Sequence, residues 1–141
     1  MWPEIKASIV ERFPRQMLNG IVSPGKPGGW DPEAEGWKQC IDSLLNIRLL
    51  EDDWDGQGSP APEAELVDSA IILAVLLRQQ HVKPPALTVQ DVQGCVNLHW
   101  EWPDGTTLDI DVMEPYRADV YLLAPDCPIE EWQLGREAIA A

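Results

Sequence analysis

Residues 96–112 alternate apolar and polar side chains with a period of two, on both sides of the turn Pro103-Asp104-Gly105. Such alternation is typical of strands in a half-buried antiparallel sheet. Proline presets the turn and glycine accepts a positive φ, so the segment predicts a hairpin. Its three-residue loop fixes a register that pairs Trp102 with Thr106, Trp100 with Leu108, Leu98 with Ile110 and Val96 with Val112. A slip by one residue would turn this whole set outward, so we expect an antiparallel sheet with one apolar face.

The opposite face of the predicted hairpin is polar. The same register pairs Glu101 with Thr107, His99 with Asp109 and Asn97 with Asp111. Carboxylates raise the pKa of a neighbouring histidine and can orient it for proton transfer, so His99 beside Asp109 resembles an acid–base pair. The register places no serine or cysteine nucleophile beside it, and a cross-strand pair of this kind also simply stabilises a sheet. Asp109 and Asp111 could bind a divalent cation, but the pattern supplies no third ligand.

Two segments before the hairpin carry apolar residues at helical spacing. The first begins at Asp31-Pro32, where aspartate can cap free amides and proline suits the first helical position. The second is expected to begin at Ser59-Pro60 for the same reason. The apolar positions are Trp37, Ile41, Leu44, Leu45 and Leu49 in the first segment, and Leu66, Val67, Ala70, Ile71, Leu73, Ala74 and Leu77 in the second. A connection of about ten residues favours antiparallel neighbours.

Two further strands are expected, one after Ala86 and one over residues 119–124, and Pro128 is expected to open a terminal helix carrying Ile129, Trp132 and Ile139. The predicted fold class is α+β with two layers: an antiparallel helix pair packed on a four-stranded antiparallel β-meander, with a short C-terminal helix and an open, polar outer sheet face. Residues 31–141 form this single domain. Residues 1–30 form an N-terminal arm, which could hold a short helix before a loop rich in glycine and proline.

The segment Asp53-Trp54-Asp55-Gly56-Gln57-Gly58-Ser59-Pro60-Ala61-Pro62 separates the two helical segments. Glu51, Asp53, Asp55, Gly56 and Ser59 match a calcium-binding loop in part, but Pro62 stands where such a loop needs a bidentate glutamate. The alternative is a structural turn made by Asp55 and Gly56, with Trp54 folded onto the helix pair and Ser59 as a helix cap. The missing ligand favours the structural turn.

The charge balance restricts the partners, since 24 acidic residues against 10 basic ones give a formal net charge of -14. A nucleic-acid backbone or an anionic membrane surface requires clustered Lys and Arg, so neither is expected as a direct partner. The longest apolar run, residues 70–77, is too short to span a bilayer, and residues 1–4 do not resemble a secretory signal. Cys40, Cys95 and Cys127 show no metal-type spacing, so a cytoplasmic location with reduced thiols is predicted.

Several motifs together resemble a group of small, uncharacterised bacterial proteins. They are Leu45-x-x-x-Leu49, the turn Asp53-Trp54-Asp55-Gly56-x-Gly58-Ser59-x-x-Pro62, Pro85, and Val96-x-Leu98-x-Trp100-x-x-x-x-Gly105-x-x-Leu108-x-Ile110. Members of that group carry an Asn/Asp-Trp-Asp-Gly turn before a helix and then a short β-meander. The resemblance covers residues 41–124 and implies a bacterial source and a compact α/β module, without implying any reaction.

Acidity fits two readings, a basic partner or simple solubility. Together with the small size and the polar sheet face, it leads us to predict a non-enzymatic interaction protein: an antitoxin, an immunity or inhibitor protein, or an accessory subunit of a larger, more basic partner. Tryptophans outside a core are favoured interface anchors, and the chain has seven tryptophans. The predicted partner-binding residues are Asn97, His99, Glu101, Asp109, Asp111, Trp2, Trp30 and Trp102. No catalytic residue, metal site or cofactor is predicted. Three alternatives stay open: a nucleic-acid mimic that inhibits a nuclease, a small metal-binding module or enzyme using His99 and Asp109, and a homodimer formed through edge strands.

Overall fold

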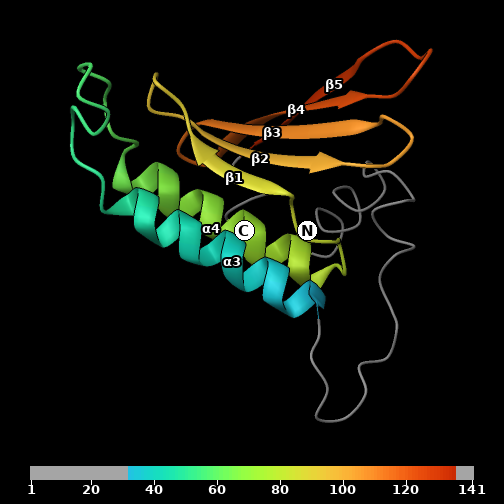
Figure 1. The fold of residues 1–141 in the computed structure, drawn as a ribbon, viewed down its shortest axis with the longest axis horizontal. Helices are drawn as coiled ribbons and strands as arrows, with labels where there is room; N and C mark the ends of the chain where they lie inside the picture. Colours follow the sequence, from blue (N-terminus) through green and yellow to red (C-terminus); the bar gives the residue numbers. More distant parts are fainter. Residues whose placement is uncertain (1–31, 136–141) are drawn as a thin grey trace.

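Two helices lie side by side on one face of a five-stranded antiparallel sheet in the computed structural model of the chain (Figure 1). The structure describes residues 32–135. Its elements are α3 (Pro32–Arg48), α4 (Ala64–Gln79), β1 (Leu87–Gln90), β2 (Val96–Glu101), β3 (Thr107–Glu114), β4 (Arg117–Leu123) and β5 (Glu130–Leu134). The strands keep their sequence order in the sheet, which is therefore a meander. The predicted α+β class is confirmed. Neither of the two described helices is long and apolar enough to cross a membrane.

The ends of α3 carry charges that suit the helix dipole. Glu33 and Glu35 lie in its first turn, near the positive end, and Arg48 lies in its last turn. Arg48 also reaches α4, where its Nε lies 2.7 Å from Oδ1 of Asp68. Both side chains of this ion pair are substantially exposed, so it contributes little to stability.

The start of α4 differs from the prediction, because the helix begins at Ala64 and not at Ser59-Pro60. Ser59 does not cap the helix, since its hydroxyl donates to Oδ2 of Asp55 inside the preceding loop. Glu63 takes the N-cap position without a side-chain capping bond. The loop between the helices therefore extends further along the chain than the capping rule indicated.

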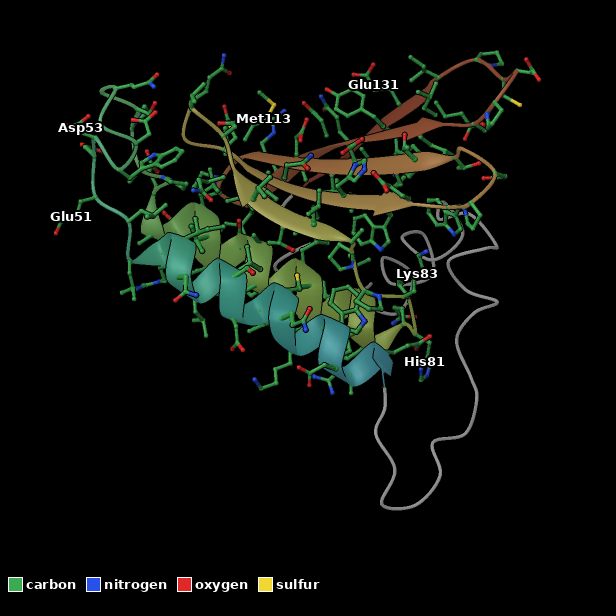
Figure 2. All side chains as sticks on the ribbon, viewed as in Figure 1. Glu51, Asp53, His81, Lys83, Met113 and Glu131 are labelled. Atoms are coloured by element: carbon green, nitrogen blue, oxygen red, sulfur yellow. The ribbon has the colours of Figure 1, made fainter. Side chains whose placement is uncertain are left out.

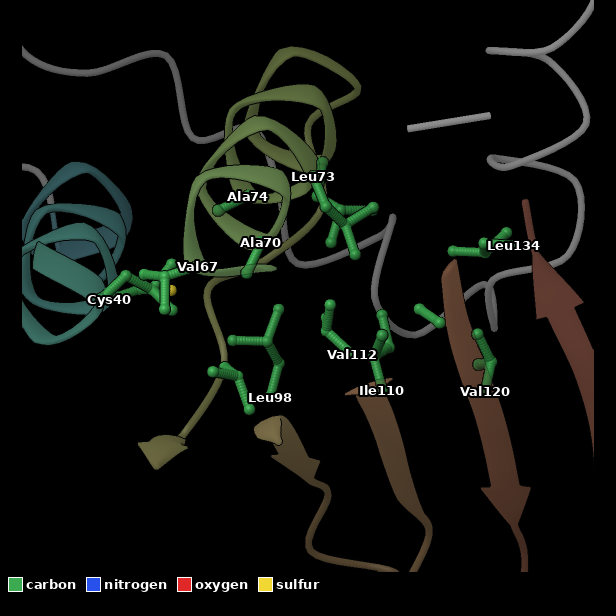
Figure 3. Close-up of a cluster of buried hydrophobic side chains, with 14 of the residues drawn as sticks. Cys40, Val67, Ala70, Leu73, Ala74, Leu98, Ile110, Val112, Val120 and Leu134 are labelled. Atoms are coloured by element: carbon green, nitrogen blue, oxygen red, sulfur yellow. The ribbon is translucent and has the colours of Figure 1, made fainter. Parts of the chain in front are cut away.

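The core lies between the helix pair and the inner face of the sheet (Figure 3). Its members without exposed surface come from both layers and include Leu44, Leu73, Leu98, Ile110 and Val120. Figure 3 shows Ala70 and Leu73 of α4 directed toward the strands that carry Leu98, Ile110 and Val112. Burying each large aliphatic side chain contributes about 1.5–3 kcal/mol, so this two-layer contact is the main source of stability.

Two core tryptophans fix the connection between α4 and β1. Nε1 of Trp37 donates to the carbonyl of Val82 at 2.9 Å, and Nε1 of Trp100 donates to the carbonyl of Lys83 at 2.8 Å. Pro84 follows directly and packs so closely on Gly36 of α3 that a side chain at position 36 would overlap its ring. One helix and one strand thus hold three consecutive residues of the connection in place.

The predicted hairpin register is confirmed. Strand β2 pairs with β3 so that Trp100 faces Leu108 on the apolar face and His99 faces Asp109 on the polar face. The N–H of Trp102 donates to the carbonyl of Thr106 at 3.0 Å and closes the turn. Turn chemistry and alternation therefore sufficed to fix this pairing.

The predicted four-strand count and C-terminal helix were wrong, because residues 130–134 form β5 on the outer side of β4. Trp132 pairs with Val120 and Leu134 pairs with Ala118, so alternate residues of this segment extend the core. The preceding Ile129 is 63% exposed, and Ile139 lies outside the described residues. The predicted arm, residues 1–30, also lies outside them.

Candidate functional site

The face of the sheet that points away from the helices is the candidate site. Strand pairing aligns two rows across it: Leu87, His99, Asp109, Tyr121 and Glu131 in one, and Val89, Asn97, Asp111, Asp119 and Gln133 in the other. We call these two rows, together with Glu101, the open face. Figure 2 shows Glu131 on this side of the sheet, away from both helices.

The hydrogen-bonding pattern of the hairpin brings the side chains of His99 and Asp109 together. Trp102 and Thr106 form a hydrogen-bonded pair, and such pairs alternate with non-hydrogen-bonded ones along an antiparallel ladder. His99 and Asp109 therefore form a non-hydrogen-bonded pair, the kind in which opposite side chains lie closer to each other. Loop length thus determines both which residues meet and how closely.

His99 is held between two carboxylates. Its Nδ1 lies 2.7 Å from Oδ1 of Asp109, and its Nε2 lies 2.9 Å from Oε1 of Glu101. Partial burial acts to lower the pKa of His99, but the hydrogen bonds and charges of Asp109 and Glu101 outweigh it, so that the pKa is raised above its ordinary value of 6.5. Only the imidazolium can donate from both nitrogens, and the two carboxylates therefore favour the charged form.

The neighbouring pair, Asn97 and Asp111, continues this polar network. Nδ2 of Asn97 donates to Oδ1 of Asp111 at 2.6 Å and lies 3.3 Å from Oδ1 of Asp109. Burial raises the pKa of the Asp111 carboxyl; the Asn97 hydrogen bond opposes this rise, and the charges of nearby aspartates add to it. Asp111 is thus a carboxylate whose charge is costly in the folded protein.

His99 and Cys95 are the groups of this network that bear on acid–base or nucleophilic chemistry. A general base needs a free nitrogen within hydrogen-bonding reach of the substrate, and both nitrogens of His99 already face carboxylates. Burial, with the charges of Asp91 and Asp111, raises the pKa of the Cys95 thiol and so disfavours a nucleophilic thiolate. Within residues 32–135, no group of three or more His, Cys, Asp or Glu side chains could hold a metal ion.

Strands β4 and β5 bring acidic residues to the open face that the sequence did not identify as part of a site. Asp119 and Glu131 join Asp109, Asp111 and Glu101 there. Partial desolvation and the charges of Asp119, Glu131 and Asp111 raise the pKa of Tyr121, which lies in the first row. The alternation of Asp119 with Val120 could have placed Asp119 on this face from the sequence. Placing Glu131 there required recognising β5 as a strand.

A shallow hollow lies at one end of the open face, beside the irregular pairing of β3 and β4. Met113, Glu114, Arg117, Asp119 and Gln133 line it. Nη1 of Arg117 lies 3.4 Å from Oε2 of Glu114, so this positive charge at the margin faces a carboxylate of its own hairpin.

The predicted anchor Trp102 does not lie with the carboxylates. It packs against the core on the helix side of the sheet, and Nζ of Lys83 lies 4.6 Å from the centre of its ring. Its Nε1 is buried without a hydrogen-bond partner among the described residues. Trp2 and Trp30, the other predicted anchors, lie outside the described range.

In the loop between the helices, carboxylates accept hydrogen bonds from the loop's own backbone. Oδ1 of Asp55 accepts hydrogen bonds from the N–H groups of Gln57 and Ser59, and Oδ1 of Asp53 accepts one from Gly58. Gly56 has a positive φ of 73° within the turn, and Nε1 of Trp54 donates to the carbonyl of Pro60 at 3.1 Å. The hydroxyl of Ser59 and these amides hold the pKa of Asp55 below its usual value. Asp53 and Asp55 thus act as acceptors for the backbone of their own turn.

Comparison with known proteins gives no family assignment. No family model matches the chain, and searches of curated proteins and of solved structures find no match.

Proposed function

We propose that the chain is a non-enzymatic, acidic protein–protein interaction module that binds a basic surface of a larger protein. In this role it acts as an inhibitor, antitoxin or immunity-type protein, or as an accessory subunit of a larger complex. The cytoplasm is the proposed compartment, and neither nucleic acid nor membrane is a direct partner.

The observation that carries this proposal is the charge of the open face. Five carboxylate side chains share it: Glu101, Asp109, Asp111, Asp119 and Glu131. The basic groups nearby are His99, held by two of these carboxylates, and Arg117 at the margin. A strongly acidic sheet face is complementary to a surface rich in Lys and Arg, and such complementarity sets both the encounter rate and the choice of partner.

The state of His99 also supports a binding role. Its imidazole is held by carboxylates from two strands and cannot reach outward to a substrate without losing one of them. The network therefore keeps the central part of the face in one conformation, which lowers the entropic cost of binding a rigid partner.

The first experiment is affinity capture of the tagged full chain from a lysate of its source, with mass spectrometry of the retained proteins. We expect one stoichiometric, basic partner whose retention falls steeply as salt is raised, since exposed charges are screened beyond about 8–10 Å at physiological ionic strength. Capture of no partner at low salt, or of one that resists high salt, would contradict binding through this acidic face.

A further inference from the structure

The two edges of the sheet differ in charge. The outer edge, β5, carries Glu130 and Glu131, whereas β1 consists of Leu87, Thr88, Val89 and Gln90 and has no charged side chain. Natural sheets protect exposed edges with charges, prolines or bulges, because an unprotected edge pairs with another strand. Within Leu87–Gln90, β1 has neither a charge nor a proline, and its one irregularity lies at its start, where the N–H of Ala86 donates to His99, the residue that pairs with Leu87. β1 is therefore the less protected edge.

The backbone of β1 offers hydrogen-bonding groups on its outer side. The N–H of Asp91 donates to the carbonyl of Cys95 at 3.0 Å, which determines which residues of β1 form hydrogen bonds with β2. Because the hydrogen-bonded pairs alternate, Val89 bonds to β2, and the backbone groups of Thr88 and Gln90 point away from it. Among the described strands, none pairs with this outer side.

The side chains next to this edge are apolar or uncharged. Leu87 is 55% exposed and Val89 is 43% exposed, and both lie on the open face. The carboxylate of Asp91, which follows the strand, turns back to accept hydrogen bonds from the N–H groups of Gln93 and Cys95. In a chain of net charge -14, this edge is therefore a neutral strip.

The adjoining helix continues the neutral strip. Gly36 of α3 touches Pro84, just before β1, and Gln39, Ser43 and Asn46 follow it at spacings of three and four residues along the same side of the helix. None of these side chains is charged. A partner that paired with β1 would thus also meet an uncharged helix flank.

We propose that β1 is the dimerisation edge of this protein and that its partner is a second copy of the same chain. The two β1 strands pair antiparallel about a twofold axis at Thr88, which places Leu87 of each copy opposite Val89 of the other. The outward N–H and C=O of Thr88 then exchange hydrogen bonds across the axis. Gln90 lies opposite Ala86 of the other copy, whose carbonyl is the acceptor for its N–H, because the N–H of Ala86 already donates to His99. The apolar side chains cover each other on the open face. The product is a continuous ten-stranded sheet, twice the five strands of one copy.

Electrostatics identify a second copy as the occupant. Strands are spaced about 4.8 Å apart, so pairing through β1 keeps Asp109 of the two copies about five spacings, or about 24 Å, apart. That distance is about three Debye lengths at physiological salt, so repulsion between the two acidic faces is largely screened. Pairing through β5 would instead place Glu131 next to its own copy. A basic partner has no charge to meet on β1 and is complementary to the open face.

The test is the oligomeric state of the full chain by sedimentation equilibrium over micromolar to millimolar concentration. A short strand pair is a small interface, so we expect reversible conversion from the 15.8 kDa monomer to a dimer of twice that mass as concentration rises. Val89→Lys places a charge on the edge, and Gln90→Pro removes an outward N–H that β2 does not use. Each should raise the dissociation constant by about tenfold or more.

Leu123→Lys is the matched control, since Leu123 is 46% exposed on the inner strand β4. Circular dichroism identifies any variant that fails to fold, and the other edge variant then carries the test. A dimer kept by Leu123→Lys, weakened by both edge variants and insensitive to added salt supports the proposal. A wild-type chain that stays monomeric at all concentrations overturns it, as does a dimer that a folded edge variant leaves intact.

Discussion

Replacing Gly36 by alanine sets two effects of similar size against each other. Alanine exceeds glycine in helix propensity by about 1 kcal/mol, so the change would stabilise an isolated helix. In the folded protein, the new Cβ would overlap Cγ of Pro84 and lie 2.9 Å from its Cβ. Overpacking of this kind costs about 1–3 kcal/mol.

The clash should win, because the ring of Pro84 has little freedom to move. The two preceding carbonyls, those of Val82 and Lys83, accept hydrogen bonds from buried tryptophans. We therefore expect Gly36→Ala to lower the free energy of unfolding by up to about 2 kcal/mol, the overpacking cost less the propensity gain. Urea unfolding followed by tryptophan fluorescence measures this as a lower midpoint at unchanged slope.

Pro84→Gly supplies the control, because it removes both ring carbons, Cγ and Cβ, that the new methyl group would meet. In that background, Gly36→Ala should be neutral or stabilising by up to about 1 kcal/mol, which makes the two sites strongly coupled. If Gly36→Ala stabilises the wild-type protein by the full propensity difference, α3 and the connection to β1 are not in rigid contact.

The remaining predictions concern the open face and the loop between the helices. Because the pKa of His99 is raised on folding, its contribution to stability is fully present below its ordinary pKa of 6.5 and is lost as pH rises through the raised value. Urea unfolding across this pH range should therefore show a decline in the free energy of unfolding that His99→Gln lacks. At neutral pH, Asp111→Asn should raise the free energy of unfolding, since desolvation raises the pKa of Asp111 and makes its charge costly. Asp109→Asn should lower the free energy of unfolding, because it removes a charged partner of His99. A stabilising Asp109→Asn with a destabilising Asp111→Asn would contradict these roles. Asp55→Ala should speed hydrogen exchange at the amides of Gln57 and Ser59, and unchanged exchange would argue against the loop contacts.

The hairpin could be predicted from the sequence because local information determined it. Alternation assigned the faces, and the three-residue turn at Pro103-Asp104-Gly105 set the register that places His99 opposite Asp109. The contact with Glu101 follows from the same alternation, since residues two apart on a strand share a face. The central part of the candidate site could therefore be predicted from the sequence.

Elements that depend on tertiary partners were not accessible in this way. Pro128 followed by acidic residues is a good local signal for a helix start, yet β4 offers an edge where Trp132 and Leu134 become buried as a strand. Ser59 likewise looked like a helix cap until the competing hydrogen bond to Asp55 was known. Missing β5 also meant missing Glu131 as part of the acidic face.

Binding through the open face is tested most directly by a pair of charge reversals on one strand. Glu130 and Glu131 are adjacent, exposed residues of β5 whose side chains point to opposite faces of the sheet. With the captured partner purified, calorimetric titration compares Glu130→Lys and Glu131→Lys with the wild-type chain at low and high salt. We predict that Glu131→Lys weakens binding severalfold at low salt while Glu130→Lys binds much like the wild type. Equal losses in both variants, or no loss in Glu131→Lys, would contradict docking through this face.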